Sequence, residues 1–242
     1  LRAFLNAIES IQAVESELPV NLMFVAEGEE ELMSKNLPSF IRKYENKLKR
    51  AHAAFFPSAS QNADGKVTMH LGCKGTFGVL LEGKGGAWGG PSRFDIHSSN
   101  QAWVDSPVWR MIQALSTMYD ARTNKILIDD WYDNVAPPSD EDMKIIDKLL
   151  ETFDEESFKE SLGVERFIDD LHGKELLLKC LYSTTLTIFH IHAGSPFPDS
   201  AKAVGVVPHK ITAKLHFRLI PNQTAEDVIP KVRLHLDRRG YK

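Results

Sequence analysis

The stretch Leu22-Met23-Phe24-Val25-Ala26-Glu27-Gly28-Glu29-Glu30-Glu31 decides the fold class of this chain. A short, continuous apolar run predicts a strand buried on both faces, here over residues 20–26. Ligands of α/β sheets bind beyond the carboxyl ends of the strands, where the carboxylates of this stretch are expected. Because clustered carboxylates repel one another, they favour a bound cation or a shared proton. The stretch therefore indicates a divalent-metal site or an acid pair, or else a solvated loop before a helix N-terminus.

The residues around this stretch alternate between helical and strand patterns. Apolar side chains recur at helical spacing before Pro19, and again from Ser34 to Leu48. The apolar run Ala51–Phe56 predicts a second short strand. Helix, strand, helix, strand is the order of a doubly wound α/β sheet. Residues 1–65 are too few for a whole domain of that class, so we expect them to be part of one.

The acidic stretch, followed by Ser34 and Leu37, resembles a signature of the zinc-dependent amidohydrolase and metallopeptidase superfamily. That group contains acetylornithine deacetylase, succinyl-diaminopimelate desuccinylase and carnosinase-type dipeptidases. The resemblance implies that Glu30 is the catalytic general base and that Glu31 is a metal ligand. Met33 departs from the pattern, which has glycine at this position.

Two later motifs support the resemblance in the expected order. Asp95-Ile96-His97-Ser98 is similar to a motif of the superfamily's lid domain, which implies that His97 reaches a partner's active site and stabilises an oxyanion. Phe217-Arg218-Leu219-Ile220-Pro221-Asn222-Gln223 matches a second lid motif, which implies that Arg218 binds the substrate carboxylate. Without the resemblance, His97 reads as a structural histidine and Arg218 as an exposed strand cation.

One expected metal ligand is missing. Counting back from Lys74-Gly75, the position where the family carries an aspartate is Ser58, whose hydroxyl is a poor ligand for zinc. The departure leaves three alternatives: one metal ion instead of two, a substitute ligand such as His52, or lost catalysis. His190 and His192 share one strand face, but no third ligand lies near them in the sequence.

The remaining chain predicts an α+β domain. Strands are expected over residues 67–73, 76–82, 126–132, 184–192 and 210–219, the last with alternating apolar side chains. The glycine-rich residues 83–92 are interpreted as a flexible hairpin connection. Three helices have N-cap signals at Ser106, Ser139 and Thr224. The stretch from about 133 to 182 resembles a helical insertion of dipeptidase-like members.

Composition excludes several classes of protein. The net charge of −4 and the absence of a basic block argue against a nucleic-acid partner. Two cysteines, Cys73 and Cys180, favour a reducing, cytoplasmic setting over a disulfide framework. No apolar run is long enough for a membrane helix. Because the first residue is Leu1, we expect residues 1–242 to be part of a longer protein.

Together these observations give one expectation of fold and function. Residues 1–65 are expected to be part of a doubly wound catalytic α/β sheet, and residues 66–242 a two-layer, ferredoxin-like α+β lid and dimerisation domain. The resemblance implies a homodimeric hydrolase that cleaves an amide bond in a dipeptide or N-acyl amino acid. It also implies one or two zinc ions, with manganese or cobalt as substitutes. The alternative is a non-catalytic dimerisation or binding protein on the same fold.

Overall fold

The computed structural model describes residues 2–55, 59–61, 65–194 and 205–242. The chain divides into two compact units, Leu1–Leu71 and Gly72–Lys242. Helices and strands occur in both units, which confirms the mixed α/β class expected from the sequence.

The first unit contains two helices and one small hairpin. Its elements are α1 (Arg2–Glu15), the 3₁₀ turn η1 (Glu30–Leu32), α2 (Leu37–Leu48), β1 (Ala59–Gln61) and β2 (Val67–Met69). The strands β1 and β2 pair in antiparallel register. The two helices predicted for this unit are present as α1 and α2, although α2 begins at Leu37, three residues later than predicted.

The strand prediction for residues 20–26 is wrong, as is that for residues 51–55. (Phe56, at the end of the second prediction, lies outside the described residues.) A strand needs a neighbour to satisfy its backbone hydrogen bonds, and neither segment pairs with another strand in the described part of the chain. Their apolar side chains are exposed accordingly, Leu22 by 51% and Phe24 by 55%.

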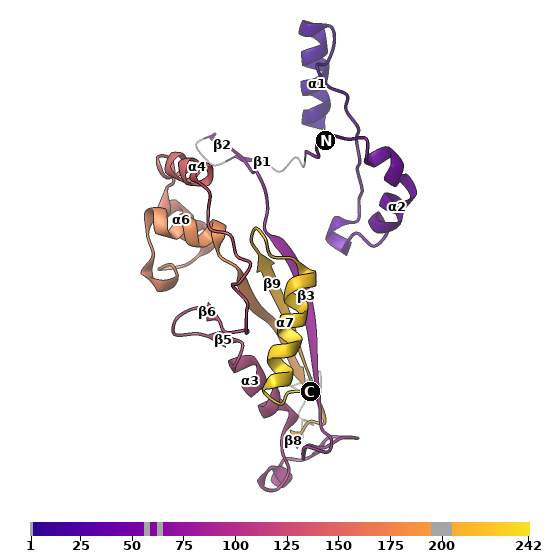
Figure 1. Ribbon diagram of the computed structural model, residues 1–242, viewed down its shortest axis with the longest axis vertical. Coiled ribbons are helices and arrows are strands. Elements are labelled where there is room, and N and C mark those ends of the chain that lie inside the picture. The colour runs from indigo at the N-terminus through magenta and orange to yellow at the C-terminus, as the bar shows by residue number, and fades with distance from the viewer. Residues whose placement is uncertain (1, 56–58, 62–64, 195–204) are drawn as a thin grey trace. The chain divides into compact units, whose positions relative to one another are not determined.

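The second unit is organised around a three-stranded antiparallel sheet (Figure 1). Its strands lie in the order β3 (Gly75–Lys84), β9 (Lys210–Leu219) and β7 (Thr185–Ala193). The central strand β9 alternates as predicted. Its inward side chains are buried, and they are Ile211, Ala213, Leu215, Phe217 and Leu219.

Two helices cover one face of this sheet, which gives the expected two-layer α+β arrangement (Figure 1). They are α3 (Pro107–Ser116) and α7 (Ala225–Arg238), and both begin at the predicted N-caps. Phe217 lies at the centre of the core, with its ring stacked on Phe77 at a centroid distance of 4.9 Å. Apolar side chains of both helices pack against the same face, among them Met111, Leu115, Val228, Val232 and Leu236.

The predicted helical segment between about 133 and 182 is present. It consists of α4 (Asp140–Leu150), α5 (Glu155–Leu162), η3 (Ile168–Asp170) and α6 (Gly173–Tyr182). Ser139 and Asp142 form the capping box expected at the start of α4. Figure 1 shows α4 and α6 side by side, close to the end of the sheet at which β7 begins.

The strand prediction for residues 126–132 is largely wrong. Only a short hairpin forms, from β5 (Tyr119–Asp120) and β6 (Lys125–Ile126). The next residues turn, because the Trp131 N–H donates to the Ile128 carbonyl at 3.2 Å and Asp130 takes a positive φ of 61°. The turn puts Ile128 and Trp131 into the core on the same side, which a strand with its period of two does not do.

The glycine-rich residues 83–92 form a compact loop instead of a hairpin connection. The loop leads from β3 to β4 (Ile96–His97), and each of these strands pairs elsewhere, β3 with β9 and β4 with β8 (Val206–Val207). A Cβ atom on Gly85 would lie 1.8 Å from the Pro91 carbonyl oxygen. Only glycine permits so close an approach of two backbone segments.

Candidate functional site

The acidic loop of the first unit is shaped by two of its carboxylates. Glu27 accepts a hydrogen bond from Ser34 Oγ at 2.5 Å and another from the Glu29 N–H at 3.3 Å. Glu29 accepts from both the side-chain amide of Asn36, at 2.8 and 2.9 Å, and its backbone N–H, at 3.2 Å. These contacts close a loop of eight residues and hold its two ends together.

The other two carboxylates of the loop, Glu30 and Glu31, make no such contacts. Both belong to the turn η1 and are exposed. In the described part of the chain, neither side chain has a hydrogen bond or an ion pair. The two residues predicted to carry chemistry are therefore the two whose oxygens stay available to a ligand.

The backbone after η1 explains the glycine of the family pattern. Met33 takes φ 70° and ψ 26°, a left-handed conformation that glycine adopts without strain. Its amide still donates to the Glu30 carbonyl at 3.0 Å, so the turn closes in spite of the methionine. The departure at Met33 thus leaves the loop formed, at a cost in backbone strain.

His97 lies at the end of β4, at the start of the 3₁₀ helix η2 (Ser98–Ala102). Its Nδ1 atom accepts the Ser99 N–H at 3.2 Å and lies 2.8 Å from Ser99 Oγ. The imidazole is exposed. Ser99 follows the motif Asp95-Ile96-His97-Ser98 directly and was not among the residues predicted from the sequence.

Contacts with His209, a residue distant in the sequence, hold the motif Asp95–Ser98 in place. Asp95 Oδ1 accepts from the His209 backbone N–H at 2.9 Å and lies 2.6 Å from His209 Nδ1. The side-chain hydrogen bond from His209 lowers the pKa of Asp95, so this residue stays a carboxylate. Asp95 is thus engaged within the lid and positions the strand that carries His97.

Arg218 lies near the carboxyl end of β9, on the face of the sheet opposite to the helices. Its cross-strand neighbours are Thr76 on β3 and Thr185 on β7. The guanidinium group is exposed, and in the described ranges it has no ion pair. Lys74 lies close enough that the Arg218 charge contributes to lowering the Lys74 pKa, after the larger effect of burial. This end of the sheet is therefore positive and open to an anion.

The structure does not bring His97 and Arg218 together. His97 pairs with Val206, and its motif is tied to His209, at the residue before β9 begins. Arg218 lies near the other end of β9, and Figure 1 shows β8 at the end of the sheet opposite to α6. Arg218 lies eight residues after Lys210 along the strand, about 27 Å at 3.4 Å per residue. One dipeptide cannot span that separation.

The described residues supply only part of a metal-ligand set. No group of three or more histidine, cysteine, aspartate or glutamate side chains is placed to hold a metal ion in the parts of the chain that the structure describes. Ser58, at the position of the expected aspartate, lies outside those parts. The rings of His190 and His192 stack at a centroid distance of 6.0 Å, and among the residues that the structure describes this pair has no third ligand.

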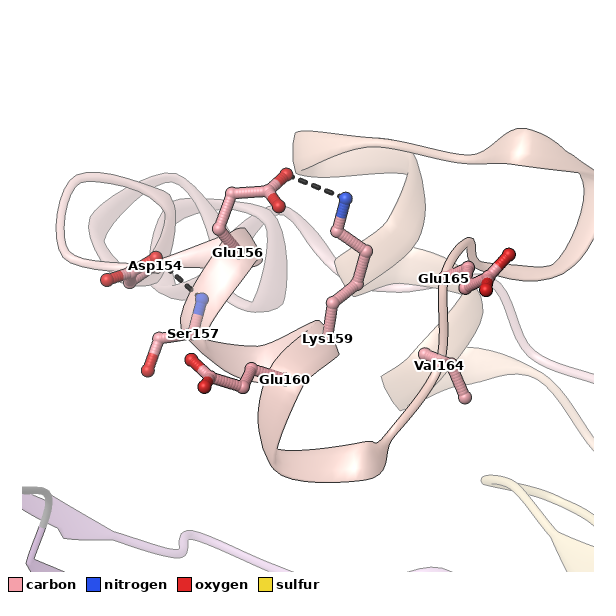
Figure 2. A pocket seen from close by; sticks show the side chains of 7 residues that line it. All are labelled: Asp154, Glu156, Ser157, Lys159, Glu160, Val164 and Glu165. Atoms are coloured by element: carbon pink, nitrogen blue, oxygen red, sulfur yellow. Dashed lines mark hydrogen bonds and ion pairs between the residues drawn. The ribbon is translucent and has the colours of Figure 1, made fainter.

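A surface hollow beside α5 is separate from all the predicted site residues. Figure 2 shows the acidic side chains around it, with Glu156 paired to Lys159 at 2.7 Å and the Ser157 N–H donating to Asp154 at 3.0 Å. These contacts pair neighbours on α5 and cap its first turn. The hollow therefore reflects the surface of one short helix.

Comparisons with known proteins point to one family. Residues 93–242 match the family model of the M20 peptidase dimerisation domain. The Beta-Ala-His dipeptidase of Rattus norvegicus is 26% identical over 237 residues, which is 97% of this chain and 46% of that protein. The Cys-Gly metallodipeptidase of Candida albicans is 27% identical over 223 residues, covering 90% and 43%.

The solved structures agree with the sequence relatives. An M20 family metallo-carboxypeptidase from Sulfolobus solfataricus superimposes with a TM-score of 0.81 at 31% identity, over 98% of this chain and 51% of that one. Human carnosine dipeptidase 1, at 23% identity and a TM-score of 0.68, shares the fold. The chain spans about half the length of the relatives it matches. It belongs to the M20 peptidase family, and residues 93–242 are that family's dimerisation domain.

Proposed function

We propose that the protein is a metal-dependent hydrolase that cleaves the amide bond of a dipeptide or an N-acyl amino acid. The observation that carries this proposal is a difference among the carboxylates of the acidic loop. Glu27 and Glu29 accept hydrogen bonds from the loop itself, whereas the side chains of Glu30 and Glu31 have no partner in the described part of the chain. Glu27 and Glu29 hold the loop, so the oxygens of Glu30 and Glu31 are free to bind a cation or accept a proton. The dipeptidase relatives support the same reaction class.

Glu31 is the proposed metal ligand, with one or two zinc ions as the expected cofactor and manganese or cobalt as alternatives. Its exposed, unpaired carboxylate suits a divalent cation, although the described residues hold no complete ligand set. When bound, such an ion polarises the carbonyl of the substrate and makes an attacking water more acidic. Glu30, one residue earlier in the same turn, accepts the water's proton and returns it to the leaving amine.

Arg218 and His97 are the proposed contacts of the lid with the substrate. Arg218 presents an unpaired guanidinium, which suits bidentate binding of the substrate carboxylate. His97 donates to the oxyanion that develops on the carbonyl. Because about 27 Å of strand separates their ends of the sheet, we assign them to two different active sites of a dimer. Each site then takes its histidine from the partner subunit.

The edge strand β7 is the proposed homodimer contact. It lies at the outside of the sheet, so one side of its backbone has no strand partner in the described part of the unit. Ile188, Phe189 and Ile191 are 42%, 60% and 50% exposed on it. An exposed apolar edge favours pairing with another strand. The other edge, β3, exposes a single large apolar side chain, Leu80.

The test uses the full-length protein, because this chain spans about half the length of its relatives. We expect bound zinc and hydrolysis of dipeptides or N-acyl amino acids. Glu30→Gln should keep the metal and lose turnover by at least about 10²-fold, as for a general base. Glu31→Gln should lose metal. Glu45→Gln, on the exposed surface of α2, is the matched control and should change neither.

The second candidate is a non-catalytic dimerisation or binding protein on the same fold. The serine at position 58 and the incomplete ligand set among the described residues favour it. A dimer without bound zinc and without turnover across a broad substrate panel would establish this candidate and refute the hydrolase. Substitution of Glu30 would then leave the dimer and its binding properties unchanged.

We also propose a cytoplasmic location for the protein. Cys73 and Cys180 are both free and exposed, which fits a reducing, cytoplasmic compartment. Among the described residues, no helix has the length and apolar character needed to cross a bilayer.

A further inference from the structure

We infer that Ser99 is a positioning residue for His97: it fixes the neutral imidazole in the tautomer that carries its proton on Nε2. The inference rests on the proposed function, because it specifies which nitrogen of His97 is offered to the oxyanion. It concerns a residue outside the motif by which His97 was found.

The contact at Nδ1 determines the tautomer. The Ser99 backbone N–H donates to Nδ1 at 3.2 Å, and a backbone N–H can only donate. Nδ1 must therefore present its lone pair, and the proton of the neutral ring lies on Nε2. Ser99 Oγ, 2.8 Å from the same nitrogen, supplies a second donor. Both donors come from one residue, so Ser99 controls this side of the ring.

The backbone around His97 is fixed from two directions. The Ser98 N–H donates to the Gly205 carbonyl at 2.8 Å, which ties the residue after His97 to the segment before β8. The Asn100 side-chain amide donates to the His97 carbonyl at 3.1 Å. The bond between Asp95 and His209 holds the strand on the other side. The ring is thus held at Nδ1 and its backbone is anchored, while Nε2 has no hydrogen-bond partner in the described part of the chain.

The choice of histidine is not explained by capping alone. His97 is the N-cap of η2, where its side chain accepts the Ser99 N–H. Asparagine, aspartate and serine make this contact better and are the residues that helix N-caps prefer. Histidine adds a second nitrogen, which points away from the capped amide and carries the available proton. A donor at that position is what a developing oxyanion requires.

Two substitutions of His97 separate capping from donation. His97→Asn keeps an acceptor for the Ser99 N–H and has no donor at the position of Nε2. We expect kcat to fall by about 10²–10³-fold, the loss typical of one oxyanion donor, with KM nearly unchanged. His97→Gln places its amide nitrogen near the position of Nε2, so we expect it to retain at least about ten times the kcat of His97→Asn.

Substitutions of Ser99 test its positioning role. Ser99→Ala removes one of the two donors to Nδ1, and we expect a several-fold loss of kcat with little change in KM. Ser99→Thr keeps both donors and should restore most of the lost kcat. Gln101→Ala is the matched control, because the Gln101 side chain donates to the Val104 carbonyl, two residues after η2 ends, and has no hydrogen bond with His97. All five variants of His97, Ser99 and Gln101 are made in the full-length protein.

Nitrogen-15 NMR of histidine-labelled protein reads the tautomer directly. We expect His97 to show a protonated Nε2 and an accepting Nδ1, and Ser99→Ala to raise the fraction with the proton on Nδ1. A wild-type ring protonated on Nδ1, or a His97→Asn variant with wild-type kcat, would overturn the inference. Should the wild type hydrolyse nothing, the proposed function fails, and the tautomer measurement still decides the role of Ser99.

Discussion

Acidification should destabilise the second unit through one buried histidine. His235, on α7, is 0% exposed. Its Nδ1 accepts the Asp129 N–H at 3.2 Å, and its Nε2 lies 3.1 Å from Thr117 Oγ1. Thr117 Oγ1 donates to the Ala114 carbonyl at 2.7 Å and so accepts from the imidazole. This network fits the neutral ring.

The sign of the pH dependence follows from the folded-state pKa of His235. Burial lowers this pKa, and the positive charge of Arg239 adds to the effect, while the charge of Asp129 opposes it. The unfolded chain, with a histidine pKa near 6.5, therefore binds a proton that the folded chain refuses. The contribution of His235 to stability is complete above about pH 6.5 and is lost as the pH falls toward the folded value.

The magnitude of this loss is bounded by proton linkage. One proton bound only by the unfolded state lowers the free energy of unfolding by at most about 1.4 kcal/mol per pH unit. Carboxylates titrate in the unfolded chain only near pH 4, so the range from about 6.5 to 5 reports on the histidines, of which His235 is the buried one among the described residues. Asp129 acts in a lower range, because hydrogen bonds from Arg239 lower its pKa, and its contribution is lost only under more acidic conditions.

Urea titrations at a series of pH values measure the effect. All four tryptophans of the chain lie between residues 88 and 131, so their fluorescence reports on the second unit. We expect the free energy of unfolding to fall between pH 6.5 and 5, and His235→Gln to remove most of that slope whatever its own stability. His190→Gln, on the exposed edge strand, serves as control. An unchanged slope in His235→Gln would refute the reasoning.

Three further substitutions test other parts of the fold. Met33→Gly should relieve the left-handed backbone after η1 and raise stability by about 0.5–1 kcal/mol, measured by urea titration of the full-length protein. Phe217→Ala should leave a cavity beside Phe77 and Trp131 and cost about 3–5 kcal/mol; a shift below about 1 kcal/mol would contradict its central place in the core. Ser139→Ala should cost about 1 kcal/mol at α4, seen as faster hydrogen exchange there.

Features set by local rules were predicted from the sequence with little error. The alternation of β9 gave every inward side chain of that strand, because a strand packed on one face must repeat with a period of two. The N-caps at Ser106, Ser139 and Thr224 were predicted correctly, since an N-cap is a contact between residues two or three apart. Neither feature depends on the rest of the chain.

Features that depend on distant partners were predicted less well. The apolar run at residues 20–26 has strand composition and lacks a paired neighbour among the described residues, so composition alone misled. The Asp95–His209 contact joins residues 114 apart, and no local pattern predicts such a contact. In the acidic loop, the role of Glu29 depends on a hydrogen bond from Asn36, which lies seven residues later in the sequence.

The motifs of this chain share one arrangement, which explains why sequence patterns could locate them. In the acidic loop, Glu27 and Glu29 bind their own loop and leave the next two carboxylates exposed. In the motif Asp95–Ser98, Asp95 accepts a hydrogen bond from the His209 backbone, and the His97 ring stays exposed. A single exposed chemical group can occur anywhere by chance. A group flanked by residues that hold its backbone at fixed spacing requires the whole pattern. The neighbours of each reactive side chain are therefore the better evidence that the reactive side chain has a function.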